Sequence, residues 1–309
     1  MKNTKKIMHS QITVLDGGMG RELQRLGAPF SQPHWSADAL IKAPEFVIQA
    51  HQNFIDAGAE IITVNAYACV PFHLGQSQYH AEGVSLAQSA AKLAHSLKET
   101  STHNFLIAGC LPPPFGSYRA DLFKHDEGMT IYHDLYQAQQ DYVDLWLIET
   151  LSSINELNAV MTMFASLPTG TIKPVHLCFT LDDESMDTPK LRSGETLKSA
   201  LDIVFSSSLP SGVMLNCSIP EVMEAAIKEI SSAENRCIDI GVYANAFTPI
   251  KQAHEANSTL QEVRDINTDE YLHYVERWIA AGATIIGGCC GITPEHIQTL
   301  SQYIRHDNT

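Results

Sequence analysis

Short apolar runs alternate with longer amphipathic stretches along almost the whole chain. The apolar runs have the length of strands and are bounded by turn residues, which predicts buried strands. These runs lie at residues 12–15, 60–64, 105–108, 145–148, 175–179, 212–215, 238–243 and 284–286. The stretches between them repeat apolar residues at helical spacing and predict helices at about 44–57, 81–97, 131–143, 153–165, 196–205, 220–230, 268–280 and 293–304. This alternation predicts an α/β fold, specifically a (β/α)8 TIM barrel.

The chain of 309 residues is expected to form one domain, residues 1–309, because α/β barrels of this size run as a single unit. Three stretches that follow predicted strands are too long for simple turns: 111–129, 181–195 and 244–267. Long loops in a compact domain usually serve as lids or binding loops. Segments after the strands of an α/β barrel lie on one face, so we expect these loops beside the active site.

Three cysteines directly follow two of the predicted strands. Cys217 lies in Asn216-Cys217-Ser218, after the run 212–215, and Cys289 and Cys290 lie between glycines after the run 284–286. The carboxyl ends of barrel strands converge on one face, where active sites are built. Three thiols that meet there suggest a zinc site whose fourth position is open.

Other interpretations of the cysteines compete with a metal site. A lone buried cysteine usually packs as a small hydrophobic residue, and this is our interpretation of Cys69, Cys110, Cys178 and Cys237. A disulfide between the neighbours Cys289 and Cys290 would be strained. The Cys-x-x-Cys spacing of redox sites is absent. A third cysteine at an equivalent strand end therefore favours a metal over packing.

Acidic residues end two of the other predicted strands. Asp16 follows the first strand and precedes Gly17 and Gly18, and Glu149 follows the fourth strand. Carboxylates bind ammonium groups, and free backbone N–H groups at a glycine turn bind carboxylates. Together with the thiols, these residues predict a site for an α-amino acid beside a metal. Taken singly, each carboxylate also fits a helix cap or a solvated loop end.

Charge and composition exclude some classes of partner. The formal net charge is −15 and the pI is about 5.3, whereas nucleic acids and anionic membranes are bound by basic surfaces. The seven cysteines are odd in number and are not spaced like a disulfide framework, which fits a reducing compartment. No apolar stretch follows the N-terminal lysines, and no run reaches the length of a membrane span. We therefore expect a cytoplasmic protein.

The chain resembles the homocysteine S-methyltransferase family, whose members are zinc-dependent barrels that bind homocysteine. The matching motifs appear in the order found in the family and extend from residue 15 to residue 291. They are Leu15-Asp16-Gly17-Gly18-Met19-Gly20, Asn65-Ala66-Tyr67, Gly109-Cys110-Leu111-Pro112-Pro113, Glu149-Thr150, Asn216-Cys217-Ser218 and Gly287-Gly288-Cys289-Cys290-Gly291. Each motif alone is weak except the last, but the set is specific.

The resemblance implies a role for each motif. It implies that Zn2+ is held by Cys217, Cys289 and Cys290, and that the homocysteine sulfur takes the fourth position. The implied substrate-binding residues are Asp16 and Glu149 for the ammonium group, Gly17 and Gly18 near the carboxylate, and Asn65, Tyr67, Asn216 and Asn245 in the pocket. Cys110 stands where the family commonly has a small or hydroxyl residue, and we interpret it as packing.

The implied activity is that of a homocysteine S-methyltransferase (EC 2.1.1 class), which transfers a methyl group from S-methylmethionine or S-adenosylmethionine to homocysteine and gives methionine. A sulfonium donor suits an acidic mouth lined with aromatic rings, for which the candidates are Tyr67, Phe115, Tyr118 and Phe247. Betaine as donor or a selenocysteine acceptor are variants of this hypothesis. A homocysteine-binding module without its own small-molecule donor and a redox barrel that uses Cys289 and Cys290 are the alternatives. The expected partners are small molecules, with homo-oligomers left open.

Overall fold

Eight parallel strands form the centre of the molecule. The computed structural model describes residues 12–168, 170–233, 238–250 and 262–307. The strands are β1 (Thr13–Val14), β2 (Ile61–Thr63), β3 (Leu106–Leu111), β4 (Leu145–Leu151), β5 (Val175–Phe179), β6 (Pro210–Asn216), β7 (Asp239–Tyr243) and β8 (Ile285–Ile286). Their order in the sheet is β1-β8-β7-β6-β5-β4-β3-β2, and a parallel bridge between Leu15 and Ile61 joins the two ends. The predicted (β/α)8 barrel is therefore confirmed.

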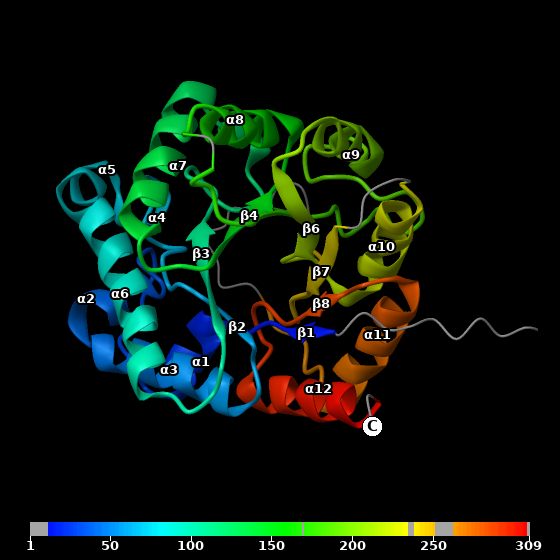
Figure 1. Cartoon of the computed structure of the whole chain (residues 1–309), viewed down its shortest axis with the longest axis horizontal. Helices are drawn as coiled ribbons and strands as arrows, with labels where there is room; N and C mark the ends of the chain where they lie inside the picture. Colours follow the sequence, from blue (N-terminus) through cyan, green and yellow to red (C-terminus); the bar gives the residue numbers. More distant parts are fainter. Residues whose placement is uncertain (1–11, 169, 234–237, 251–261, 308–309) are drawn as a thin grey trace, which may run out of the picture.

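Helices surround the ring of strands (Figure 1). They are α1 (Met19–Arg25), α2 (Ala37–Lys42), α3 (Pro44–Asp56), α4 (Pro71–Leu74), α5 (Gln76–Gln78), α6 (Val84–Thr100), α7 (His125–Gln139), α8 (Ile154–Ala165), α9 (Leu197–Ser206), α10 (Met223–Ser232), α11 (Thr268–Ala281) and α12 (Pro294–Asp307). Short π and 3-10 segments lie at Tyr79–Gly83, Ala120–Leu122 and Pro220–Val222. No described helix is long and apolar enough to cross a membrane.

Local sequence signals explain where the best-predicted helices begin and end. Helix α8 begins with a capping box, in which the Ser153 side chain accepts from the Glu156 N–H and the Glu156 carboxylate accepts from the Ser153 N–H. Helix α11 begins with the same arrangement at Asn267 and Glu270, and it ends at Gly282, which has a φ of +119°. These caps satisfy N–H groups that a helix start otherwise leaves unpaired.

The prediction of a long loop at 111–129 is wrong in its extent. Leu111 is still part of β3, and helix α7 begins at His125 rather than near residue 131. The first turn of α7, residues 125–128, contains no apolar side chain and carries Asp126 and Glu127, so it adds nothing to the apolar pattern from which the helix was inferred. The loop at 181–195 is present, with a bridge between Leu181 and Leu191. Much of the predicted loop 244–267 lies outside the described residues.

Apolar side chains pack both inside the barrel and around it. A first cluster lies between the strands and the surrounding helices and includes large buried residues such as Trp146 and Trp278. A second, smaller cluster is made of Leu15, Ile61, Ala108, Leu145, Leu147, Cys178, Met214, Tyr243 and Ile285. The inward-facing side chains of a TIM barrel form a packed core rather than a pore, so a binding site must lie at one end.

Candidate active site at the carboxyl ends of the strands

One pocket opens where the strands end. Its lining comes from β4, from the carboxyl ends of β2 and β7, from segments after β1, β2, β3, β6, β7 and β8, and from the segment between α1 and α2. The lining residues are Asp16, Gly17, Gly18, Met19, Gly20, Phe30, Trp35, Ser36, Thr63, Val64, Asn65, Tyr67, Ala68, His73, Ser117, Tyr118, Glu149, Cys217, Tyr243, Phe247, Ile250, Gly288, Cys289 and Cys290. Segments distant in sequence therefore meet at the face where barrel enzymes carry their active sites.

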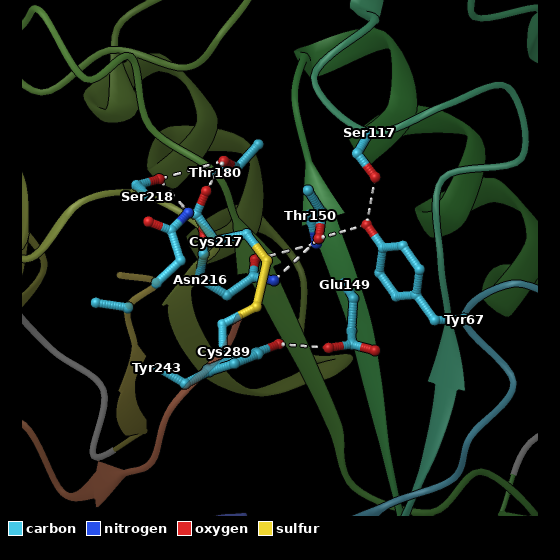
Figure 2. The surroundings of a disulfide bond; sticks show 12 residues. Tyr67, Ser117, Glu149, Thr150, Thr180, Asn216, Cys217, Ser218, Tyr243 and Cys289 are labelled. Atoms are coloured by element: carbon cyan, nitrogen blue, oxygen red, sulfur yellow. Dashed lines mark hydrogen bonds between the residues drawn. A yellow bond between two sulfur atoms is a disulfide. The ribbon is translucent and has the colours of Figure 1, made fainter. Parts of the chain in front are cut away.

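The three cysteines singled out from the sequence all line this pocket. Cys217 and Cys289 form a disulfide with their Cα atoms 5.9 Å apart, and Cys290 is free (Figure 2). The expected set of three free thiols in the pocket is therefore not present in this form, because two of the sulfurs are bonded to each other. Within the described ranges, no group of three or more His, Cys, Asp or Glu side chains is arranged to hold a metal.

Close backbone packing fixes the position of the cysteine loop after β8. The Cys289 N–H donates to the Ala244 carbonyl at 2.9 Å. A Cβ atom at Gly18 would lie 2.6 Å from the Cys289 carbonyl oxygen, so only glycine permits this approach. The Gly18 N–H donates to the Ile292 carbonyl at 2.8 Å. The expectation of two free glycine N–H groups is therefore wrong at Gly18, because its N–H already has a partner.

Asp16 is buried at the end of β1 and is held by one residue of β2. Its two carboxylate oxygens accept from the Thr63 N–H at 2.7 Å and from the Thr63 hydroxyl at 3.1 Å. Only 4% of Asp16 is exposed, and this burial raises the pKa of its carboxyl group from 3.8 to about 8. Thr63 also lines the pocket, and the sequence analysis did not single it out.

Glu149 stands on the pocket wall at the end of β4 and receives two neutral donors. The Cys110 thiol donates to Glu149 Oε2 at 2.8 Å, and the Tyr243 hydroxyl donates to Glu149 Oε1 at 3.2 Å. Burial raises the pKa of the Glu149 carboxyl group, and the two donors act in the opposite direction. Cys110 is part of the core, as expected, but its thiol also forms a hydrogen bond with the pocket residue Glu149.

Both pocket carboxylates lack a basic partner. Among the described residues, no Lys, Arg or His side chain forms a salt bridge with Asp16 or Glu149, whose hydrogen bonds come only from Thr63, Cys110 and Tyr243. Buried carboxylates are normally paired, because an isolated charge is costly to remove from water. A pocket with two such groups is suited to a cationic ligand.

A chain of hydrogen bonds joins four strand ends behind the cysteines (Figure 2). The Tyr67 hydroxyl hydrogen-bonds to Ser117 Oγ at 2.7 Å and donates to Thr150 Oγ1 at 3.1 Å. The Asn216 side chain accepts from the Thr150 N–H at 3.0 Å and donates to Thr150 Oγ1 at 2.9 Å. Both ends of the Asn216 amide are therefore used to hold the residue that precedes Cys217 to β4.

The predicted substrate-binding asparagines occupy different environments. Asn65 lines the pocket, and its amide donates to the Ser36 carbonyl at 3.4 Å. Asn216 and Asn245 are fully buried and are not among the lining residues. Asn245 accepts from the Phe247 N–H at 3.1 Å. The structure places these last two behind the pocket wall, where they support the strand ends.

Backbone strain is concentrated around the pocket. Four described residues other than glycine have positive φ angles: Trp35 (+49°), Tyr118 (+66°), Thr150 (+60°) and Cys217 (+50°). Three of them line the pocket, and Thr150 is the centre of the hydrogen-bond chain behind it. Non-glycine residues in this conformation cost of order 1–3 kcal/mol each and cluster at functional sites.

Aromatic side chains form one side of the pocket. Phe30 and Trp35 pack edge to face with ring centroids 5.7 Å apart, and His73 packs against Trp35 at 6.4 Å. Of the rings proposed from the sequence, Tyr67, Tyr118 and Phe247 line the pocket, whereas Phe115 is not among its lining residues. Phe30, Trp35 and His73 were missed because the segments that carry them show no regular apolar period.

A buried ion pair fastens the loops above the pocket. Asp183 accepts from Arg192 at 3.0 Å and from the backbone N–H groups of Ile219 at 3.1 Å and Ile250 at 2.8 Å. The Arg192 guanidinium lies over the Tyr118 ring, 4.8 Å from its centroid. This pair therefore connects the segments after β3, β5, β6 and β7, three of which contribute lining residues.

Comparison of the sequence with known proteins identifies relatives among the homocysteine and selenocysteine methyltransferases. Residues 13–304 match the family described as homocysteine S-methyltransferase. Homocysteine S-methyltransferase 1 from Brassica oleracea var. italica is 27% identical, with 94% of this chain and 93% of the relative covered. The homocysteine S-methyltransferase of Escherichia coli (strain K12) is 26% identical, with 94% of both chains covered. Selenocysteine Se-methyltransferase from Brassica oleracea var. italica is 25% identical, with coverages of 93% and 87%.

Solved structures agree with the sequence comparison. The metallated form of the homocysteine methyltransferase MmuM from Escherichia coli superposes with a TM-score of 0.77 at 25% identity, covering 95% of this chain and 96% of that one. The oxidized form of the same protein gives a TM-score of 0.78 with the same identity and coverage. Because the family match spans nearly the whole described chain, this protein belongs to the homocysteine S-methyltransferase family, whose members are methyltransferases.

Proposed function

We propose that this protein transfers a methyl group from a sulfonium compound to the thiol of homocysteine in a zinc-dependent reaction that yields methionine. The observation that carries the proposal is the content of one pocket. Cys217, Cys289 and Cys290 line it together with two buried carboxylates, Asp16 and Glu149, that have no basic partner among the described residues. One cavity therefore contains the cysteines that we propose as zinc ligands, where the substrate thiol would bind, and the carboxylates that we propose for its ammonium group.

The donor set fits zinc. Cysteine thiolates are preferred zinc ligands, and three protein ligands with an open fourth position are typical of catalytic zinc sites. Cys217 follows β6 and Cys289 follows β8, which are separated in the sheet by β7, yet the two residues are close enough to form a disulfide. Their reduction provides two adjacent thiols in the pocket that Cys290 also lines. We propose that these three residues hold the ion, which when bound keeps a substrate thiol deprotonated at neutral pH.

The two carboxylates are the proposed site for the substrate ammonium group. Both oxygens of Asp16 accept hydrogen bonds from Thr63, and the two oxygens of Glu149 accept hydrogen bonds from Cys110 and Tyr243. These contacts restrict the rotation of both carboxylates. A cation placed between them favours their charged forms and offsets the cost of burying them. Binding at the amino end then directs the other end of homocysteine, its sulfur, toward the cysteines.

The transfer step itself needs little from the protein except alignment. The homocysteine thiolate attacks the methyl carbon of the donor, a new C–S bond forms, and the bond between that carbon and the sulfonium sulfur breaks. The electron pair of the broken bond remains on the donor sulfur, which becomes a neutral thioether. With S-methylmethionine as donor, both products are methionine. Holding the two reactants in line accounts for much of the rate enhancement in such reactions.

The aromatic side of the pocket supports a sulfonium donor. Phe30 and Trp35 form an edge-to-face pair on the wall, and Tyr67 and Phe247 also line the cavity. Aromatic faces attract cations that carry little hydration, by about 0.5–2 kcal/mol per ring. Two further features suit a positive donor: the acidic pocket carboxylates and the net charge of −15.

A donor panel tests this proposal. The reduced, zinc-supplemented protein is incubated with homocysteine and, separately, with S-methylmethionine, S-adenosylmethionine or betaine, and methionine is quantified. We expect methionine with at least one sulfonium donor. If homocysteine binds but no donor gives methionine, the protein is a homocysteine-binding module and the proposal is overturned. If betaine alone is used, the sulfonium assignment is wrong.

Metal analysis tests the zinc assignment separately. Cys217→Ser and Cys290→Ala are each expected to reduce zinc content and methionine formation together, because removing one thiolate opens the ligand set. Cys69→Ala is the control, since Cys69 is a free thiol that does not line the pocket. A fully active protein that contains no zinc after reduction and chelation would contradict the assignment.

A further inference from the structure

The carboxylate of Glu149 is fixed from inside the barrel by two side chains of other strands. Cys110 is on β3 and donates to one carboxylate oxygen at 2.8 Å, and Tyr243 is on β7 and donates to the other at 3.2 Å. Neither donor is exposed by more than 3%. With one donor on each oxygen, rotation of the carboxylate about its terminal bond breaks both contacts.

The position of Cys110 is itself tightly controlled. The side chain of Gln139, on α7, accepts from the Cys110 N–H at 3.0 Å and donates to the Cys110 carbonyl at 2.9 Å. Gln139 is fully buried and also donates to the Leu135 carbonyl of its own helix at 3.0 Å. A buried polar side chain thus anchors this residue of β3 to α7, which fixes the direction from which the thiol reaches Glu149.

The chemical nature of the two donors suits a receptor for a cation. A lysine or arginine beside Glu149 would neutralise its charge and occupy the space of an incoming ammonium group. A thiol and a phenol stabilise the charged carboxylate without cancelling its charge. The remaining lone pairs of the carboxylate stay available on the pocket side, since Glu149 lines the pocket.

We propose that Cys110 and Tyr243 are positioning residues that orient the Glu149 carboxylate toward the ammonium group of the amino-acid substrate. The proposal rests on the function proposed above and deepens it, because it assigns to Cys110 and Tyr243 a part in amino-group recognition that acts through Glu149. Cys110, which the sequence suggested to be a packing residue, thereby contributes to substrate selection.

A pair of acceptor substrates separates positioning from a general structural role. Homocysteine and its desamino analogue 4-mercaptobutanoate share the thiol, chain length and carboxylate, and they differ in the ammonium group. The quantity to measure is the ratio of kcat/KM for homocysteine to kcat/KM for the analogue. Loss of amino-group recognition lowers this ratio, whereas general damage to the pocket lowers both values and leaves the ratio unchanged.

The variants are Cys110→Ala, Cys110→Ser and Tyr243→Phe. We expect Cys110→Ala and Tyr243→Phe to lower the ratio about fivefold or more, mainly by raising the KM for homocysteine, while kcat at saturating homocysteine changes less than twofold. Cys110→Ser retains a donor of similar size and is expected to keep the ratio within twofold of wild type. Cys69→Ala removes an equally buried thiol outside the pocket and is expected to leave the ratio unchanged.

The outcomes distinguish this proposal from the function on which it rests. If wild type gives methionine but the ratio is unchanged in both Cys110→Ala and Tyr243→Phe, the positioning role is overturned and the function stands. If wild type methylates neither thiol with any donor, the proposed function fails. Tyr243→Phe decides the matter if Cys110→Ala does not fold, because it removes one hydroxyl and leaves the ring in place.

Discussion

The buried carboxylates above the pocket and on its wall are compensated in opposite ways. Above the pocket, Asp183 is 1% exposed and is paired with Arg192 and with two backbone N–H groups. On the pocket wall, Asp16 and Glu149 are 4% and 7% exposed, but their hydrogen-bond donors are all uncharged. Burial is similar in the two regions, whereas only one contains a cation.

This difference distinguishes Asp183, whose charge is compensated within the fold, from Asp16 and Glu149, which are suited to bind a cationic ligand. A buried charge without a partner costs several kcal/mol, so a fold that needs only stability pairs it, as Asp183 is paired. The same chain leaves two carboxylates of the pocket without a cation among the described residues. Glu156 is also buried without a cation from the described part of the chain, but its carboxylate accepts from the backbone N–H groups of Ser152 and Ser153 at the start of α8. Among the described residues, Glu149 accepts from no backbone N–H group, and a ligand that brings its own positive charge would compensate it. The following changes test this contrast, in order of decreasing expected effect.

Arg192→Met should produce the largest loss of stability. It leaves the Asp183 carboxylate buried without its cation, which typically costs about 3–5 kcal/mol. Chemical denaturation at neutral pH measures the loss. Lys228→Met is the control, since it removes an exposed partner of Glu224 and should change the free energy of unfolding by less than about 0.5 kcal/mol. An Arg192→Met variant as stable as wild type would remove the distinction between the two regions.

Glu149→Gln should affect binding rather than folding. Loss of the charge is expected to weaken homocysteine binding about 10- to 100-fold, the equivalent of about 1.4–2.8 kcal/mol, while the free energy of unfolding is unchanged or higher. Calorimetric titration with homocysteine and metal analysis of the same sample provide the two measurements. Retained zinc with weakened binding supports the ammonium role, and loss of zinc from this variant would show that the role is wrong.

Asp16 should make stability depend on pH in an unusual direction. Its pKa is raised from 3.8 to about 8, so between these values the folded state holds a proton that the unfolded state has released. The stabilisation is complete below pH 3.8 and is lost as the pH rises through 8, with a slope of at most about 1.4 kcal/mol per pH unit. Asp16→Asn removes this contribution, so the difference between variant and wild type should grow in favour of the variant from pH 6 to pH 8.

Denaturation of the metal-free protein at pH 6, 7 and 8 measures that difference. A constant difference across this range would mean that the Asp16 carboxyl group is ionised throughout and that its burial has little effect.

Tyr67→Phe should have the smallest effect. The change removes the hydroxyl that joins Ser117 and Thr150, while Thr150 keeps its two hydrogen bonds with Asn216. We expect a loss of about 1 kcal/mol in the free energy of unfolding and little change in zinc content. A loss of zinc in this variant would indicate that the hydrogen-bond chain, rather than the strands themselves, fixes Cys217.

Sequence periodicity predicted the barrel because each strand and most helices carry their own local signal. The convergence of Cys217, Cys289 and Cys290 could be predicted for the same reason, since segments that follow the strands of a barrel share one face. Their state could not be predicted: the sequence gives spacing, and whether two sulfurs bond to each other depends on distances that only the fold defines.

The residues that support the site were beyond the reach of sequence patterns. Thr63 is one of many threonines until β1 and β2 place it against Asp16. The Asp183–Arg192 pair joins positions nine residues apart within a loop that has no periodicity. Cys110 was placed correctly in the core, but its contact with Glu149 depends on the register between β3 and β4. Such contacts are properties of the tertiary structure rather than of any local segment.

The most direct test of the account uses deuterated homocysteine and unlabelled S-methylmethionine with the reduced, zinc-loaded protein, and follows both forms of methionine by mass spectrometry. The account predicts one deuterated and one unlabelled methionine for each donor molecule consumed, with Cys217→Ser inactive. A folded, zinc-loaded protein that binds homocysteine but forms no deuterated methionine from this donor or from S-adenosylmethionine would contradict it.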